Sequence, residues 1–317
     1  MKNKLVLALI LIVGLVVFCA VRDFIIKNVV VGVVSNVTGA PTRIGGFSLS
    51  IIKQTVSIAD LKMYNPKGFP EDVLVDMPKI AVSYDLGALL KGKLHLKQLD
   101  IDLKEIGLAK NKQGKLNVDS LKIVEEQKKN KGNKKSDKVI AIQIDLVSLS
   151  MGRVVNKDYS VEGPAVIKVY EINLKKTYKN ITSVQQLSAL IMAEPLKAAG
   201  IQGAKIYGVM MLTGVAALPV AVVFTLAGKD YAQANFDLSW DRAYDLGMKQ
   251  LQNSGKIKNG DRKKGIIHAE VNGAGVALQL KKITDLKTQI TVSARKFGLP
   301  QPEISSGILY RISQELK

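Results

Sequence analysis

The segment Ile80-Ala-Val-Ser-Tyr84 alternates larger apolar side chains with small ones, and a period of two continues on both sides of it. This alternation is typical of a β-strand that has one apolar and one polar face. Turn residues separate successive segments, as at Asn65-Pro66-Lys67-Gly68. The pattern therefore predicts a series of antiparallel strands. The other alternating segments before residue 125 are Phe47–Ile51, Val56–Ala59, Leu61–Met63, Leu94–Leu96 and Ile101–Lys104.

The sheet is expected to continue beyond a lysine-rich insertion. Residues 125–138, EEQKKNKGNKKSDK, contain six lysines and no apolar residue, which predicts an exposed, flexible loop. We interpret this loop as a solvated linker, with an anion-binding loop at a lipid surface as the alternative. Alternation resumes at Val139–Leu146 and Ala165–Ile172. An apolar helix over 182–199 then follows, and it is the one helix available to cover this sheet.

Near the amino terminus, Leu5 to Val21 form a charge-free apolar segment of seventeen residues that ends at Arg22. A helix of this length, extended by its flanks, spans a hydrocarbon core of about 30 Å. A cleaved signal peptide is the competing interpretation, but Phe18-Cys19-Ala20-Val21 is a poor cleavage site because bulky residues replace small ones. Phe18 also disfavours a lipoprotein signal at Cys19. We predict an uncleaved transmembrane anchor and a helical extension over residues 1–37.

A second uncharged stretch, residues 206–228, leaves two alternatives open. By length it could span a bilayer, but Gly214, Pro219 and several alanines weaken this interpretation. The segment 201–229 is therefore either an apolar linker or a second membrane segment. The choice determines which side of the membrane the last residues occupy.

The final segment, residues 230–317, has a pattern of its own. Phe236 to Tyr244 leads into an amphipathic helix that continues through Leu251. The order α-β-β-β-α predicts a small α+β domain with helices on one face of a sheet, so the whole chain is predicted to be α+β. The strands are expected at Gly265–Val271, Gly275–Leu280 and Thr288–Ala294, and the closing helix at Ile304–Leu316.

The formal net charge of +19 and the pI near 9.7 indicate an anionic partner, either nucleic acid or anionic lipid head groups. A nucleic-acid surface would interleave aromatic side chains with basic ones, and the lysine-rich loop contains no aromatic residue. The predicted anchor also argues against this class. We therefore expect membrane phospholipid, and no nucleic acid, as the partner, with envelope proteins as further partners.

Residues able to support catalysis are few and scattered. His95 and His268 lie in separate strand-like segments without metal-ligand spacing, and Cys19 is the single cysteine. Asp100 and Asp102 share one strand face beside lysines, which is typical of a solvated face rather than an acid–base pair. No nucleophile-elbow, phosphate-loop or dinucleotide motif is present. We therefore predict no enzyme, no metal site and no cofactor.

Several short motifs follow the single anchor in a fixed order. They are Thr38-Gly39, Ile44-Gly45-Gly46, Val56–Leu61, Asn65–Phe69, Tyr84-Asp85-Leu86 with Leu89-Leu90, and Gly114–Asn117. Together they resemble the N-terminal region of the AsmA-like family of bacterial envelope proteins, and the resemblance covers about residues 1–200. Through Phe236–Tyr244 and Ile304–Ile312, residues 230–317 more loosely resemble a small bacterial domain family of unknown function.

The resemblance implies a curved antiparallel sheet over residues 38–200, in the periplasm and tethered to the bacterial inner membrane. It also implies an apolar concave face through which phospholipid is bound or transferred during envelope maintenance. This chain is much shorter than the larger family members, whose sheet continues for many hundreds of residues.

An antiparallel sheet with one apolar face must cover that face. If the covering helix leaves part of it open, the remainder suits acyl chains, at about 0.8 kcal/mol for each buried methylene. The alternatives are an ordinary sheet-and-helix core and, at the level of function, a membrane-tethered scaffold that contacts proteins and carries no lipid. The side chains expected to line the apolar groove are Val56, Ile58, Ile80, Val82, Leu94, Leu96, Ile101 and Leu103.

Overall fold

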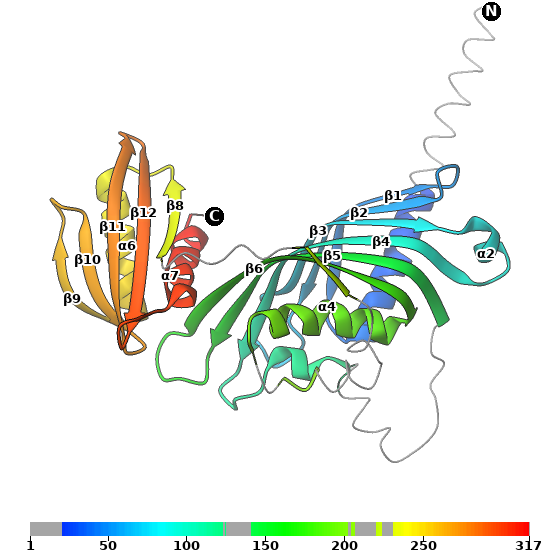
Figure 1. Cartoon of the computed structure of the whole chain (residues 1–317), viewed down its shortest axis with the longest axis horizontal. Coiled ribbons are helices and arrows are strands. Elements are labelled where there is room, and N and C mark those ends of the chain that lie inside the picture. Colours follow the sequence, from blue (N-terminus) through cyan, green and yellow to red (C-terminus); the bar gives the residue numbers. More distant parts are fainter. Residues whose placement is uncertain are drawn as a thin grey trace, which may run out of the picture.

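The computed structural model describes residues 21–122, 124, 141–201, 204–206, 220–223 and 231–316. These residues form an α+β protein with two mostly antiparallel sheets, which confirms the α+β part of the prediction (Figure 1). The predicted anchor lies outside the described residues except for Val21, and so does the lysine-rich loop 125–138. None of the described helices has both the length and the apolar character needed to cross a membrane.

The first sheet contains seven strands in the order of the sequence, β1 to β7. All neighbouring pairs are antiparallel except β4 and β5, which run parallel from Leu94 opposite Ile142 to Lys110 opposite Asp158. The prediction of purely antiparallel strands is therefore wrong at this pair, because the long connection 111–140 returns the chain to the starting end of β4. The strands are β1 (Thr42–Ser50), β2 (Thr55–Tyr64), β3 (Val73–Tyr84), β4 (Leu94–Lys110), β5 (Ala141–Asp158), β6 (Val166–Ser183) and β7 (Val220–Val223).

Strand β7 comes from the uncharged stretch 206–228. Its four residues pair with β6, from Lys175 opposite Val223 to Tyr178 opposite Val220. Part of this stretch therefore extends the first sheet. Apart from β7 and Ile206, the stretch lies outside the described residues.

Two helices cover the same face of the first sheet (Figure 1). The predicted covering helix is present as α4 (Val184–Ala198), and the Ser183 Oγ accepts a hydrogen bond of 3.1 Å from the Gln186 N–H as its N-cap. Residues 21–38 form the second helix, and Val30, Val34 and Val37 pack against the core. The sequence predicted this helix only as an extension of the anchor. The core of the first unit therefore lies between the sheet and these two helices.

The second sheet contains six strands, in the order β13-β12-β11-β10-β9, with β8 pairing along β12. The predicted α-β-β-β-α order is present but incomplete, since β8, β9 and β13 were not predicted. The edge strand β9 has the sequence KIKNGD, which contains a single large apolar residue and gives no clear alternation. The elements are β8 (Tyr231–Phe236), α6 (Trp240–Ser254), β9 (Lys256–Asp261), β10 (Ile266–Val271), β11 (Ala274–Thr284), β12 (Lys287–Lys296), β13 (Leu299–Pro300) and α7 (Pro302–Gln314).

Helix α7 lies between the two units (Figure 1). One side of it places Ile304, Ile308 and Ile312 in the core of the second sheet. The other side packs Tyr310 against Val155 and Val169 of the first sheet. A Cβ atom on Gly307 would lie 2.2 Å from the Ile167 carbonyl oxygen, so only glycine allows this close approach of α7 to β6.

Candidate apolar binding face

The structure brings all eight predicted groove residues onto one face of the first sheet. Side chains directly opposite each other in an antiparallel pair share a face, and Ile58 is opposite Ile80, which is opposite Ile101. A bulge between Leu96 and Gln98, opposite the Ser83–Tyr84 step, keeps the earlier part of β4 on this face too. The remaining members are Val56, Val82, Leu94 and Leu103, and the covered face that they share is called the inner face below.

Burial of the eight predicted residues falls from one end of the inner face to the other, although their neighbours Tyr84, Ile142 and Ile144 at the second end are buried. Ile58, Ile80, Ile101 and Leu103 are buried in the core, so these four belong to an ordinary sheet-and-helix interior. Val56, Val82 and Leu96 are only half-buried. Leu94 is 40% exposed. The end of the inner face that holds Leu94 is called the open end below, and the opposite end the closed end.

A buried polar network closes the other end of the inner face. The Asn117 Nδ2 donates to the Asn65 Oδ1 at 2.7 Å and to the Gly107 carbonyl oxygen at 2.8 Å. The Asn65 Nδ2 in turn donates to the Pro70 carbonyl oxygen at 2.9 Å. These two asparagines come from separate turn motifs, and the structure joins the motifs directly. Their side chains satisfy backbone groups that would otherwise be costly to bury.

The open end is formed by three segments that hydrogen bonds hold together. The Arg22 guanidinium donates to the Leu49 carbonyl oxygen at 2.7 Å, which ties the start of helix 21–38 to the end of β1. The Gln54 Oε1 accepts from the Leu86 N–H at 3.1 Å, which ties the β1–β2 turn to the short helix α2 (Leu86–Leu90). The chain therefore enters the described structure at the open end, directly after the predicted anchor.

A charged pair interrupts the inner face beneath α4. The Lys176 Nζ lies 2.5 Å from the Glu194 Oε2, and Glu194 is only 3% exposed. Lys176 is opposite Leu149 in the register, so it interrupts the apolar row that includes Ile58, Ile80, Ile101 and Leu149. Burial, reinforced by the negative charge of Glu194, raises the pKa of the neighbouring Tyr178 hydroxyl. Sequence reasoning missed this pair, because two adjacent lysines in a strand resemble a solvated edge.

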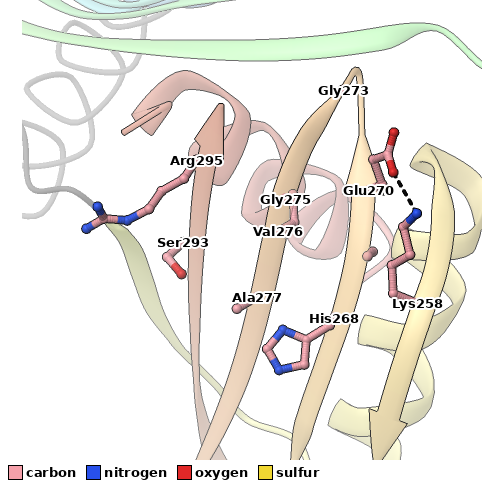
Figure 2. Close-up of a pocket in the computed structure, with 10 residues that line it drawn as sticks. Lys258, His268, Glu270, Gly273, Gly275, Val276, Ala277, Ser293 and Arg295 are labelled. Carbon is pink, nitrogen blue, oxygen red and sulfur yellow. Dashed lines mark ion pairs between the residues drawn. The ribbon is translucent and has the colours of Figure 1, made fainter. Parts of the chain in front are cut away.

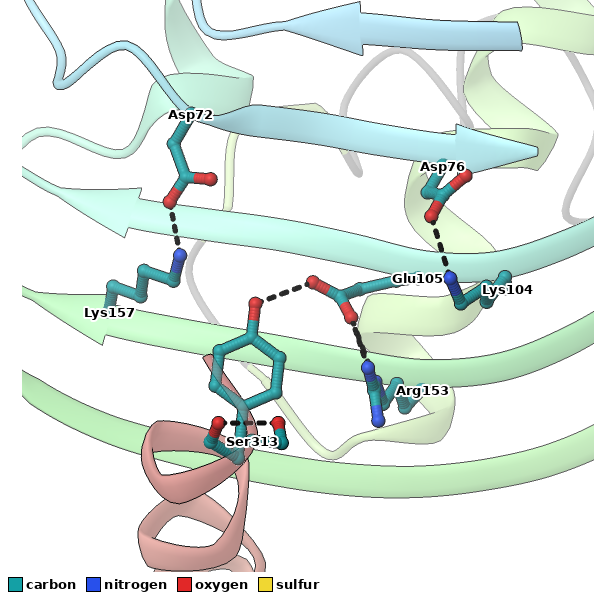
Figure 3. A network of polar contacts seen from close by, with 8 residues as sticks. Asp72, Asp76, Lys104, Glu105, Arg153, Lys157 and Ser313 are labelled. Carbon is teal, nitrogen blue, oxygen red and sulfur yellow. Dashed lines mark hydrogen bonds and ion pairs between the residues drawn. The ribbon is translucent and has the colours of Figure 1, made fainter. Parts of the chain in front are cut away.

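The opposite, outer face of the first sheet carries charged side chains (Figure 3). Lys104 pairs with Asp76 at 3.1 Å, and Arg153 pairs with Glu105 at 2.7 Å. The Tyr310 hydroxyl of α7 donates to the Glu105 Oε1 at 3.0 Å, which connects the second unit to this face. Asp100 and Asp102 also belong to this face, opposite Ala81 and Lys79, as the solvated-face prediction required.

Both histidines are strand-face residues, as predicted. His95 Nε2 lies 2.8 Å from the Asp145 Oδ2, and hydrogen bonding from His95 lowers the pKa of that carboxyl group. His268 lines a shallow cavity of about 540 Å³ on the second sheet, beside the ion pair of Lys258 and Glu270 (Figure 2). Hydrogen bonding from Lys258 lowers the pKa of Glu270. Within the part of the chain that the structure describes, no three His, Cys, Asp or Glu side chains gather as metal ligands.

Comparison with known proteins assigns no family to this chain. No model of a known protein family matches the sequence, and no curated protein matches it significantly. The resemblance to the AsmA-like family therefore stays a prediction that rests on the quoted motifs. The site itself is defined by geometry: an apolar inner face that is closed at Asn65 and Asn117 and open at Leu94.

Proposed function

We propose that this chain is an AsmA-like, membrane-anchored protein of the bacterial envelope that binds or hands on phospholipid at the open end of its inner face. The observation that carries the proposal is the gradient of burial. Apolar side chains that share one face change from buried at Ile101 to 40% exposed at Leu94. The exposed part lies where Arg22 brings the chain into the structure, next to the predicted anchor.

The chemistry of the open end suits acyl chains. Val82, Leu94 and Leu96 are aliphatic, and each acyl methylene that they shield from water contributes about 0.8 kcal/mol. Six shielded methylenes would contribute about 5 kcal/mol on the same scale. Because α4 and helix 21–38 both pack on the inner face, the lipid in this proposal enters only the part of it around Val82, Leu94 and Leu96. In this proposal the protein shields only part of each acyl chain from water, which suits a protein that passes a lipid on.

A second function, as a scaffold, is supported by a separate observation. The buried half of the inner face is an ordinary core, and the outer face carries charged pairs that already receive α7. A membrane-tethered scaffold that contacts proteins and carries no lipid fits these features. Strand β1 lies at the edge of the first sheet, and the part of its edge that does not contact helix 21–38 would offer such a contact.

Native mass spectrometry of the full chain, extracted from bacterial membranes in mild detergent, tests the proposal. We expect phospholipid to co-purify in a fixed ratio and to be lost when Leu94 or Leu96 is changed to aspartate. Lipid around the anchor is unaffected by these changes, so the difference between variants is the informative quantity. Leu286→Asp is the matched control, because Leu286 lies in the second unit and is 76% exposed.

Circular dichroism of each variant checks that it remains folded. A folded chain whose lipid content is the same in Leu96→Asp, Leu286→Asp and the parent would contradict lipid binding at the open end. That result would support the scaffold function instead.

A further inference from the structure

Exposed apolar side chains gather at the open end, beyond the inner face itself. Ile52 in the β1–β2 turn is 95% exposed and Leu90 in α2 is 80% exposed. Phe24, in the first turns of helix 21–38, is 65% exposed. Single exposed aliphatic residues are common on soluble proteins, but several in adjoining segments indicate an interaction surface. Ile25, Ile51 and Leu89 add to the same group.

Hydrogen bonds place these segments beside one another. The Tyr84 N–H donates to the Gln54 carbonyl oxygen at 3.0 Å, and the Tyr84 hydroxyl donates to the Ser50 carbonyl oxygen at 3.3 Å. Both contacts bind the β1–β2 turn to the strand end that leads into α2. The Leu49 N–H donates to the Asp23 Oδ2 at 3.4 Å, which adds helix 21–38 to the same cluster. The turn 51–54, α2 and residues 22–25 are called the apolar tip below.

Positive charges border the apolar tip. Lys53 follows Ile52 in the turn, and Lys91 and Lys93 follow Leu90 at the end of α2, all exposed. Asp23 is paired with Arg22 at 2.6 Å, and the Asp85 carboxylate accepts from the Ala88 N–H at 2.8 Å as the cap of α2. Aliphatic residues surrounded by lysines are the composition that binds at the interface of an anionic bilayer.

We propose that the apolar tip docks on the surface of an anionic phospholipid bilayer, with Ile52 and Leu90 below the head groups and the lysines among them. The inference rests on the proposed membrane anchoring, because residue 22 directly follows the predicted span Leu5–Val21. Interfacial side chains of this kind reach about 5–10 Å into the boundary between head groups and acyl chains. Docking sets the open end, including Leu94, against the lipid that it would receive.

Spin-label depth measurements on the full chain in phosphatidylethanolamine–phosphatidylglycerol vesicles test this docking. One variant combines Cys19→Ser with Ile52→Cys, so that the label reports on the apolar tip. The matched control combines Cys19→Ser with Phe297→Cys, because Phe297 lies in a turn of the second unit and is also 95% exposed. The parent chain, labelled at Cys19, reports independently whether the anchor is inserted.

We expect the Ile52→Cys label to lose access to a water-soluble nickel relaxant several-fold relative to the Phe297→Cys label, and to gain access to oxygen. A lipid-inserted Cys19 label with equal nickel access at positions 52 and 297 would overturn the docking and leave the anchoring intact. A Cys19 label that is fully accessible to nickel would overturn the anchoring and the docking together.

Discussion

The two sheets of this protein differ in how completely the apolar face of each is buried. Each has helices on one face, and the second sheet buries Ile267, Leu278 and Val292 fully between its strands and helices. The inner face of the first sheet is closed at one end and leaves Leu94 exposed at the other. The covered face of the second unit therefore serves as a core, whereas the inner face of the first unit also presents apolar surface at the open end.

The exposure at the open end is confined to one side of the sheet. Both helices begin at this end, because Arg22 of helix 21–38 bonds to Leu49 and Ser183, the N-cap of α4, is opposite Ala141. On the neighbouring strand, Ile142 lies opposite Leu94 and is buried. The exposed apolar surface of the first sheet is therefore a local feature around Leu94.

The largest effect is expected from truncating leucines at different depths. Leu278→Ala in the second core and Leu103→Ala on the inner face should each lower the free energy of unfolding by about 2–5 kcal/mol, because both side chains are buried. Leu94→Ala at the open end should change it by about 0.5 kcal/mol or less. Urea denaturation of the full chain in detergent measures all three. If Leu94→Ala lowered the free energy of unfolding as much as Leu103→Ala, the inner face would be closed throughout.

A smaller loss is expected where the two units meet. Gly307→Ala places a Cβ atom 2.2 Å from the Ile167 carbonyl oxygen and should cost about 1–3 kcal/mol as α7 moves away from β6. Hydrogen exchange should also become faster in β6. Gly32→Ala is the control, because it lies in a helix with no atom within 4 Å of the added Cβ, and alanine favours helices. Equal hydrogen-exchange rates in β6 of both variants would mean that the packing of α7 does not depend on this close approach.

The hydrogen bond between Tyr310 and Glu105 links the second unit to the outer face of the first. Tyr310→Phe and Glu105→Gln should each destabilise the protein by about 1 kcal/mol, and the double variant by less than the sum. A double-mutant cycle on urea denaturation gives the coupling energy. Because Glu105 also pairs with Arg153, the cycle isolates the tyrosine contact from the ion pair. If the free-energy changes of the two single variants simply added in the double variant, the Tyr310 and Glu105 side chains would not interact.

The smallest effect concerns acid stability at Asp145. Hydrogen bonding from His95 lowers the pKa of this carboxyl group in the folded protein, so the ionised form stabilises the fold. The stabilisation is present above the unfolded pKa of about 3.9 and is lost as the pH falls through the lower folded value. The pair is partly exposed, so Asp145→Asn should remove at most about 1 kcal/mol near pH 6. Unfolding measured between pH 6 and pH 3 should then show a shallower acid dependence in the variant.

Much of the first sheet could be predicted from alternation alone. The segments at Val56, Ile80 and Ile101 are strands, and the apolar residues at alternate positions share one face as expected. The covering helix α4 was also predictable, because Ser183 and Gly200 bracket an apolar run that follows the last long strand. A period of two places Ile101 and Leu103 on one face, but Leu94 and Leu96 share that face only because of the bulge before Gln98, which alternation does not predict.

Other features could not be predicted because they depend on contacts far apart in the sequence. The parallel pairing of β4 with β5 depends on where a long connection returns the chain, which alternation does not encode. The packing of helix 21–38 on the inner face was hidden, because most residues from Phe24 to Val37 are apolar and they form no single stripe. Lys176 pairs with Glu194 through α4, eighteen residues later, so its burial had no local signal.

The sequence by itself determined the strands, their apolar faces and the helix that covers one of them, because these follow from local periodicity and capping. Only the tertiary structure decided how far that cover extends. The change from buried Leu103 to exposed Leu94 depends on where helix 21–38 and α4 pack on strands that are distant in the sequence, and the closed end forms where Asn65 meets Asn117. Partial cover is a property of how separate elements pack together, so no single segment carries it.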